Sequence, residues 1–131
     1  MLKWLNSLWA NADLRVGGSP VAAGLHGIER MGPGGVLLDL PRGSSTVADL
    51  KRRFTKGDVS MRVADYLSYD PLKIARLGAT TAAVLASCYL IGIPAGDGDN
   101  LCLTDEGVLF RKDFGGLFGS RPGGAQGRAF D

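Results

Sequence analysis

Few residues of this 131-residue chain have the type and spacing that catalysis or metal binding requires. His26 is the only histidine, and with Glu29 it forms a His-x-x-Glu pair that could in principle bind a metal ion or share a proton. A metal site needs further ligands at compatible positions, and the sequence offers none beside this pair. We therefore interpret His26 as a loop histidine without a catalytic role and expect no metal.

Other polar clusters also lack the spacing of a catalytic or cofactor site. The segment Gly32-Pro33-Gly34-Gly35 is a turn rather than a phosphate loop, because neither a helix start nor a lysine follows it. No nucleophile elbow, Walker loop or dinucleotide fingerprint occurs. We expect a non-enzymatic protein without cofactors. The clustered acids do not fit an EF-hand loop and predict solvated turns; they are Asp97, Asp99, Asp105 and Glu106.

The two cysteines and the N-terminal segment bear on the compartment. Cys88 and Cys102 are too few for a disulfide framework and lie among apolar residues, which predicts buried thiols. Residues 1–14 contain no continuous apolar core of the kind a signal peptide has. We expect an intracellular or cytoplasmic location, or a place inside a virus particle.

Charge is segregated along the chain. Residues 42–76 carry eight bases and four acids, whereas residues 77–110 carry four acids and neither lysine nor arginine. We interpret the dense basic cluster in the first of these segments as a solvated helix face, with phosphate binding as the alternative. Possible phosphate or nucleic-acid contacts are Lys51, Arg52, Arg53, Lys56, Lys73 and Arg76.

Hydrophobic periodicity and capping residues predict the elements. Residues 1–12 have the spacing of a short amphipathic helix, and residues 36–40 form a compact apolar strand. Residues 17–35 are broken by glycine and proline and are expected to be mostly irregular. Helices are predicted at 47–54, after the caps Ser44-Ser45-Thr46, and at 59–69.

The following residues predict two short helices and a hairpin. Asp70-Pro71 starts a helix that should end at Gly78, which we expect at positive φ as a left-handed C-cap. Thr80 or Thr81 should cap a second helix that runs to about Ile91. A tight turn at Asp97-Gly98 and two short strands, 101–103 and 108–110, complete the pattern. The predicted core is Val63, Leu67, Leu72, Leu77, Val84, Leu85, Leu90, Ile91, Leu101, Leu103 and Val108.

This pattern of helix, glycine turn, threonine cap, helix and hairpin resembles a winged helix-turn-helix domain over residues 59–112. The matching stretches are Ile74–Val84, Leu90-Ile91-Gly92-Ile93 and Asp97–Gly107. The chain departs from DNA-binding members of that family, because its second helix offers Thr80, Thr81, Ser87 and Tyr89 and no cation. Acids in the expected wing turn, Asp97 and Asp99, would be repelled by phosphates.

The expected organisation is a small α+β, mainly helical, winged-helix-like domain with extended Gly-rich N- and C-terminal arms. The division is 1–45 for an N-terminal helix and Gly-rich arm with one strand, 46–114 for the winged-helix-like domain, and 115–131 for the C-terminal arm. Residues 77–96 contain twenty residues without a charge, which is long enough to span a bilayer. Glycine, proline and hydroxyl residues dilute this run, so we interpret it as a buried core helix.

Three functions remain open at this point. The first is a structural or adaptor subunit of a large assembly, such as a virus or phage particle, bound to other protein subunits in multiple copies. Its partner-binding residues would lie on the two arms: Trp4, Trp9, Leu117, Phe118 and Phe130. The alternative is a small DNA-binding regulator that uses the basic cluster. The third is a membrane protein with a single span over residues 77–96.

Overall fold

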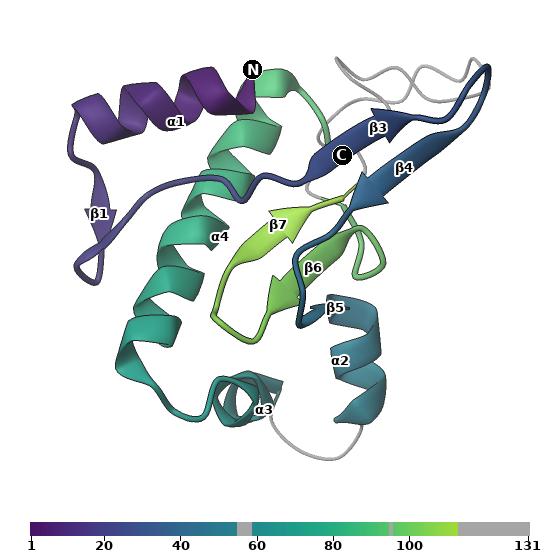
Figure 1. The fold of residues 1–131 in the computed structure, drawn as a ribbon. Helices are drawn as coiled ribbons and strands as arrows, with labels where there is room; N and C mark the ends of the chain where they lie inside the picture. The colour runs from purple at the N-terminus through teal and green to yellow at the C-terminus, as the bar shows by residue number, and fades with distance from the viewer. Residues whose placement is uncertain (55–58, 95, 113–131) are drawn as a thin grey trace.

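The computed structural model describes residues 1–54, 59–94 and 96–112 (Figure 1). A long central helix, α4 (Pro71–Ile91), is flanked by small antiparallel sheets and shorter helices. The arrangement is a mixed α+β fold, as the sequence predicts. The other elements are α1 (Leu2–Asn11), β1 (Arg15–Val16), β2 (Ser19–Pro20), β3 (Gly27–Arg30), β4 (Val36–Asp39), β5 (Ser44–Thr46), α2 (Val47–Arg53), α3 (Val59–Tyr66), β6 (Leu101–Thr104) and β7 (Leu109–Arg111).

Helix α4 begins and ends where local signals predict. The Asp70 carboxylate accepts a hydrogen bond from the Leu72 amide at 2.8 Å, and Pro71 occupies the first turn. Gly92 ends the helix in the left-handed conformation, with φ of 69°. The predicted break at Gly78 is wrong, because Gly78 lies inside α4, which is one uninterrupted helix of 21 residues. The helix-turn-helix on which the winged-helix resemblance depends is therefore absent from α4.

A three-stranded sheet packs beside α4, in the order β5-β6-β7. Cys102 of β6 is opposite Phe110 of β7, so the hairpin predicted from the sequence is confirmed. Strand β5 was missed, because Ser44–Thr46 were expected only as caps. Thr46 does cap α2, since its hydroxyl accepts from the Asp49 amide at 3.0 Å. The Thr46 hydroxyl also donates to the Asp49 carboxylate and, together with Arg52, lowers the pKa of that carboxyl.

Two apolar clusters form the core, and both include residues of β6. One joins the C-terminal half of α4 to Ile93, with Leu2 of α1 packed against it. The other joins Leu50 of α2 to Leu103 and Leu109. The predicted core residues Leu67, Val84, Ile91 and Leu103 are buried, but Leu72, Leu85 and Leu90 are exposed. Leu85 and Leu90 were misassigned because the buried side of α4 runs through Val84, Cys88 and Ile91 instead.

The N-terminal residues are more ordered than the sequence suggests. Residues 17–35, expected to be irregular, contain β2 and β3, which pair with β1 and β4. Helix α1 docks on its own domain through buried Leu5 and through the Asn6 side chain. The Asn6 amide donates to the Ala23 carbonyl at 3.0 Å and accepts from the Ala23 amide at 2.8 Å. The β3–β4 hairpin projects from the body of the molecule (Figure 1).

Thr80 lies in the middle of α4 and does not cap a helix, contrary to the prediction. Its hydroxyl donates to the Arg76 carbonyl at 2.9 Å and accepts from the Leu109 amide at 2.9 Å, which ties α4 to β7. Thr80→Val should leave the buried Leu109 amide without a partner and destabilise the fold by about 1–3 kcal/mol in urea unfolding. Thr81→Val is the matched control, and we expect a change within about 0.5 kcal/mol. Equal effects of the two variants would contradict the assigned role of the Thr80 hydroxyl.

Candidate functional site

The apolar face of α1 is largely exposed. Met1, Trp4 and Leu8 follow helical spacing and are exposed, with Trp4 63% exposed, while Leu5, on the same face, is buried. Trp9, the other predicted contact residue, is half-buried. The amphipathic helix predicted from the sequence is therefore present, and it keeps its apolar face open to solvent.

The C-terminal half of α4 presents a second apolar surface. Arg76 is the last charged residue of the helix. Beyond it, Leu85, Tyr89 and Leu90 point to solvent, with Leu90 59% exposed. The sequence suggested a buried helix here, whereas only the opposite side of α4, which includes Ala83 and Cys88, is buried.

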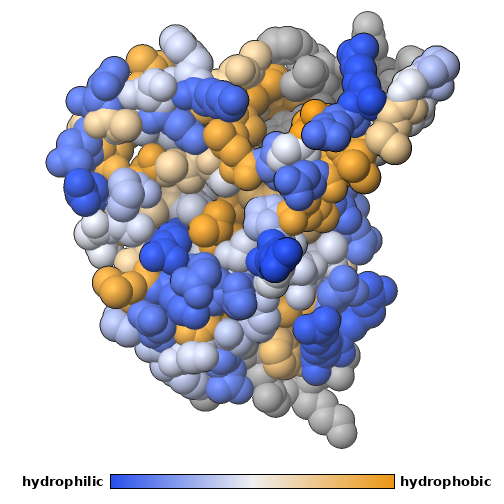
Figure 2. All heavy atoms as spheres, viewed as in Figure 1, coloured by the Kyte–Doolittle hydropathy of each residue, from blue (hydrophilic) through white to orange (hydrophobic). Residues whose placement is uncertain are grey.

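These two surfaces meet in a groove between α1 and the C-terminal end of α4. Its volume is about 620 Å³, and its walls are Met1, Trp4, Leu5, Leu90 and Ile91. Figure 2 shows apolar atoms interrupting the polar surface between α1 and the β3–β4 hairpin. The walls offer dispersion contacts and no catalytic group. The groove is therefore suited to an apolar side chain of a partner rather than to a reaction.

The β3–β4 hairpin adds exposed apolar area that the sequence analysis missed. Ile28 is opposite Leu38 across the two strands, and both are exposed. Met31, Leu37 and Leu40 are exposed as well. A usable signal was present, because Gly32-Pro33-Gly34-Gly35 separates two short segments rich in apolar residues, as in a hairpin.

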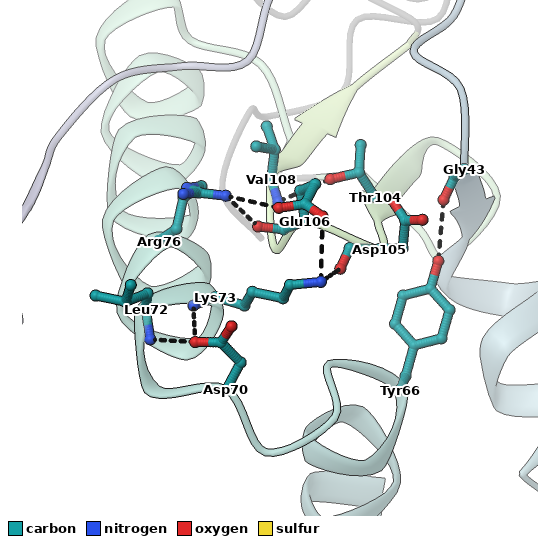
Figure 3. A network of polar contacts seen from close by, with 10 residues as sticks. All are labelled: Gly43, Tyr66, Asp70, Leu72, Lys73, Arg76, Thr104, Asp105, Glu106 and Val108. Atoms are coloured by element: carbon teal, nitrogen blue, oxygen red, sulfur yellow. Dashed lines mark hydrogen bonds and ion pairs between the residues drawn. The ribbon is translucent and has the colours of Figure 1, made fainter.

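A polar network fixes the turn between β6 and β7 against α4 (Figure 3). The Lys73 ammonium is 3.2 Å from the Glu106 carboxylate and donates to the Asp105 carbonyl at 3.0 Å. The Arg76 guanidinium donates to the Glu106 carbonyl at 2.8 Å. Tyr66 of α3 donates its hydroxyl to the Gly43 carbonyl at 3.0 Å. Lys73 and Arg76, predicted as possible phosphate contacts, thus have anionic and carbonyl partners within the fold.

The other predicted basic residues lie apart from this network. Lys51, Arg52 and Arg53 are exposed on the last turn of α2, and Arg52 forms an ion pair with Asp49. Lys56 lies outside the described residues. The predicted contact residues Leu117, Phe118 and Phe130 also lie outside them.

The predicted acidic cluster is divided between two turns. Asp97 lies before β6, where its carboxylate accepts hydrogen bonds from the Asp99 and Asn100 amides, both at 3.1 Å. Asp97 and Asp99 were expected in the turn between the two hairpin strands, and this expectation is wrong. Asp105 and Glu106 occupy that turn. Within the described parts of the chain, no three acidic, histidine or cysteine side chains are grouped closely enough to hold a metal ion.

The His26 ring packs against Phe110, with 5.7 Å between ring centroids, while Glu29 is exposed on β3. Glu29 therefore lies in a strand, within a segment that the sequence predicted to be mostly irregular. Cys88 and Cys102 are free and buried, as predicted, and burial raises the pKa of the Cys102 thiol. Neither cysteine has the exposed, electropositive surroundings of a reactive thiolate.

Helix α4 is long and apolar enough to cross a membrane by length and composition, with a mean hydropathy of 1.5 over its best window. About 39% of that window is buried within the protein. A core helix of a soluble protein satisfies the same criteria, so this finding alone does not identify a span.

The chain matches no known protein family, and a search of curated proteins finds no significant similarity. Its function must therefore be argued from its own surfaces.

Proposed function

We propose that this protein is a non-catalytic structural or adaptor subunit of a multi-subunit protein assembly. The observation that carries the proposal is the apolar groove between α1 and the end of α4, with Trp4 and Leu90 exposed on its two walls. Contiguous apolar surface on a soluble chain marks a contact site, because leaving it in water forfeits hydrophobic stabilisation. Tryptophan is also enriched among the residues that dominate protein interfaces.

The projecting β3–β4 hairpin supports the same function. A two-stranded hairpin is at best marginally stable by itself, and this one exposes Ile28, Leu37 and Leu38. A neighbouring subunit that covers these side chains would gain buried apolar area. It could also add a strand to the β3–β4 sheet, which has two strands in the described part of the chain. We further propose that Leu117, Phe118 and Phe130 contribute contacts in an assembly such as a virus particle, as the sequence predicts.

A DNA-binding regulator is the alternative, and the exposed cations of α2 are the observation that favours it. Two of the six candidate cations, Lys73 and Arg76, are engaged by Glu106 in the fold. Fewer free cations mean fewer neutralised phosphates and a smaller release of counterions. We therefore favour a protein partner.

The proposal can be tested by sedimentation of the protein from the cells or particles that contain it. The wild type should sediment in a large complex, and Trp4→Ser/Leu90→Ser should move to the light fractions, because the apolar contact is lost. Both positions are exposed, so the thermal transition should stay within a few degrees of that of the wild type.

Lys51→Ser/Arg53→Ser is the matched control, since it removes two exposed side chains from a different surface. This variant should remain in the complex. If the wild type sediments as a free subunit, or if only the basic variant leaves a DNA-containing fraction, the adaptor proposal is wrong and the regulator takes its place.

A further inference from the structure

We propose that two copies of this chain pair through the exposed side of the C-terminal half of α4, with the two helices antiparallel about a two-fold axis. The surface that makes this contact, the α4 seam, consists of Ala82, Leu85, Ala86 and Tyr89, all of them exposed. The inference deepens the proposed assembly function, on which it rests, because it names a second copy of the chain as the partner on this side of the molecule.

The first argument is that the seam continues a side of α4 that the fold covers elsewhere. Five residues of the helix follow one another at intervals of three and four, the spacing of a helix-pairing surface: Ala75, Gly78, Ala82, Leu85 and Tyr89. The β1–β2 hairpin, which lies beside α4 in Figure 1, covers the first two of them. A Cβ built on Gly17 of this hairpin would lie 3.2 Å from the Ala75 Cβ, and one built on Gly78 would lie 3.3 Å from Cγ1 of Val16. The last three residues of the series are exposed instead.

The second argument is the absence of charge. Arg76 is the last charged residue of α4, and the Tyr89 hydroxyl is the only polar side-chain group on the seam, whereas Ser87 is buried on the other side of the helix. An uncharged surface can be buried against a copy of itself without leaving an ion unpaired. Helices that lie on membranes carry lysine or arginine beside their apolar face, and the seam has neither. These features favour a second copy over a charged partner or a lipid surface.

The third argument is that large and small side chains alternate along the seam. An antiparallel pair centred between residues 85 and 86 places Leu85 opposite Ala86 of the second copy and Tyr89 opposite its Ala82. Each large side chain then meets a small one, so the two helices can approach closely without steric overlap. A parallel pair in register would instead bring Tyr89 against Tyr89.

The exposed apolar area is close to what a stable dimer needs. Leu85, Tyr89 and Leu90 are 51%, 71% and 59% exposed, and Leu90 is a wall of the groove that also contains Met1 and Trp4. Together these residues expose on the order of 700 Å² per subunit, against about 800 Å² per partner in a standard interface. No charge pair adds to this contact, so we expect a dissociation constant of about 1–10 μM, at the weak end for such an area.

Sedimentation velocity of the purified full chain tests the pairing, over concentrations from about 0.1 to 100 μM. The wild type should pass from monomer to dimer across this range. Ala86→Glu should raise the dissociation constant by about 100-fold or more, because two carboxylates would meet near the two-fold axis. Ala10→Glu is the matched control, since it makes the same change at an exposed position of α1 outside the seam, and it should leave the constant unchanged.

A second variant covers the case in which Ala86→Glu fails to fold. Leu85→Ser should weaken the dimer by about tenfold. At sub-micromolar concentration the chain is monomeric, so truncation of the exposed Leu85 side chain should leave its unfolding nearly unchanged there. A wild type that remains monomeric at the highest concentration would overturn the proposal, and so would equal effects of Ala86→Glu and Ala10→Glu.

Two single cysteine variants test the antiparallel register. Ala86→Cys lies next to the proposed axis and should form a disulfide-linked dimer on mild oxidation. Ala82→Cys is its matched control, because its two copies would be about 10 Å apart along the helices and should not be linked. The native Cys88 and Cys102 are buried and are the same in both variants. Linkage of Ala82→Cys alone, or of both variants equally, would overturn the antiparallel pairing.

The pairing and the assembly function can fail separately. A purified wild type that is monomeric, yet sediments in a large complex from cells, would overturn the pairing alone. A dimer in the purified protein without any larger complex in cells would support the pairing and overturn the assembly function. Flotation of a monomeric wild type with phosphatidylcholine vesicles would assign the seam to lipid and overturn the pairing.

Discussion

Phe110→Ala should destabilise the protein more than any other single truncation of a core side chain, by about 3–5 kcal/mol. The Phe110 side chain is completely buried at the centre of β7, opposite Cys102 and in contact with the His26 ring. Its removal would leave a cavity between the sheet and residues 24–26, and a ring of this size is poorly replaced by relaxation of its neighbours. Urea unfolding monitored by far-UV circular dichroism would measure the loss.

Leu85→Ala is the control for this experiment. The sequence places Leu85 in the core, where its truncation would cost about 2–5 kcal/mol. The structure leaves the side chain 51% exposed on α4, so we expect a change below about 0.5 kcal/mol. A large effect of Leu85→Ala together with a small effect of Phe110→Ala would mean that α4 packs on the sheet through its other face.

The features that the sequence predicts correctly depend on local chemistry. Asp70 with Pro71, Thr46 and Gly92 define helix ends because each satisfies or terminates the backbone within a few residues. The β6–β7 hairpin is likewise encoded by short apolar strands around Gly107. Such signals need no knowledge of distant contacts, and for this reason they remain valid in the folded chain.

The sequence-based predictions fail where contacts between residues distant in the chain determine the local structure. Gly78 followed by Ala79 and Thr80 has the composition of a turn and a cap, yet Ala79 and Thr80 are buried in a continuous helix. Small side chains here let β1 and β7 approach α4 closely, and the Thr80 hydroxyl is used by the β7 backbone. The groove between α1 and α4 was equally unpredictable, because its walls are joined only by tertiary packing.

Gly107→Ala should destabilise the fold by more than about 2 kcal/mol, whereas Gly78→Ala should be neutral or stabilising. Gly107 has φ of 83°, and a Cβ built on it would lie 2.9 Å from the carbonyl carbon of Lys73 and still closer to the carbonyl oxygen. The backbone of α4 cannot move aside cheaply, because Lys73 and Arg76 hold the same turn through Glu106. Backbone strain and steric overlap therefore add at this position.

At Gly78 we expect an added methyl group to be tolerated, although the sequence predicts a positive φ at this residue. It lies inside α4, where replacing glycine by alanine stabilises a helix by up to about 1 kcal/mol. Its added methyl would meet only the Cγ1 atom of Val16, at 3.3 Å, in a short and exposed hairpin that can shift slightly. Relative to the wild type, the midpoint of urea unfolding should thus fall for Gly107→Ala and stay the same or rise for Gly78→Ala. If Gly78→Ala were the damaging change and Gly107→Ala the mild one, the chain would turn at residue 78 and the winged-helix arrangement would be restored.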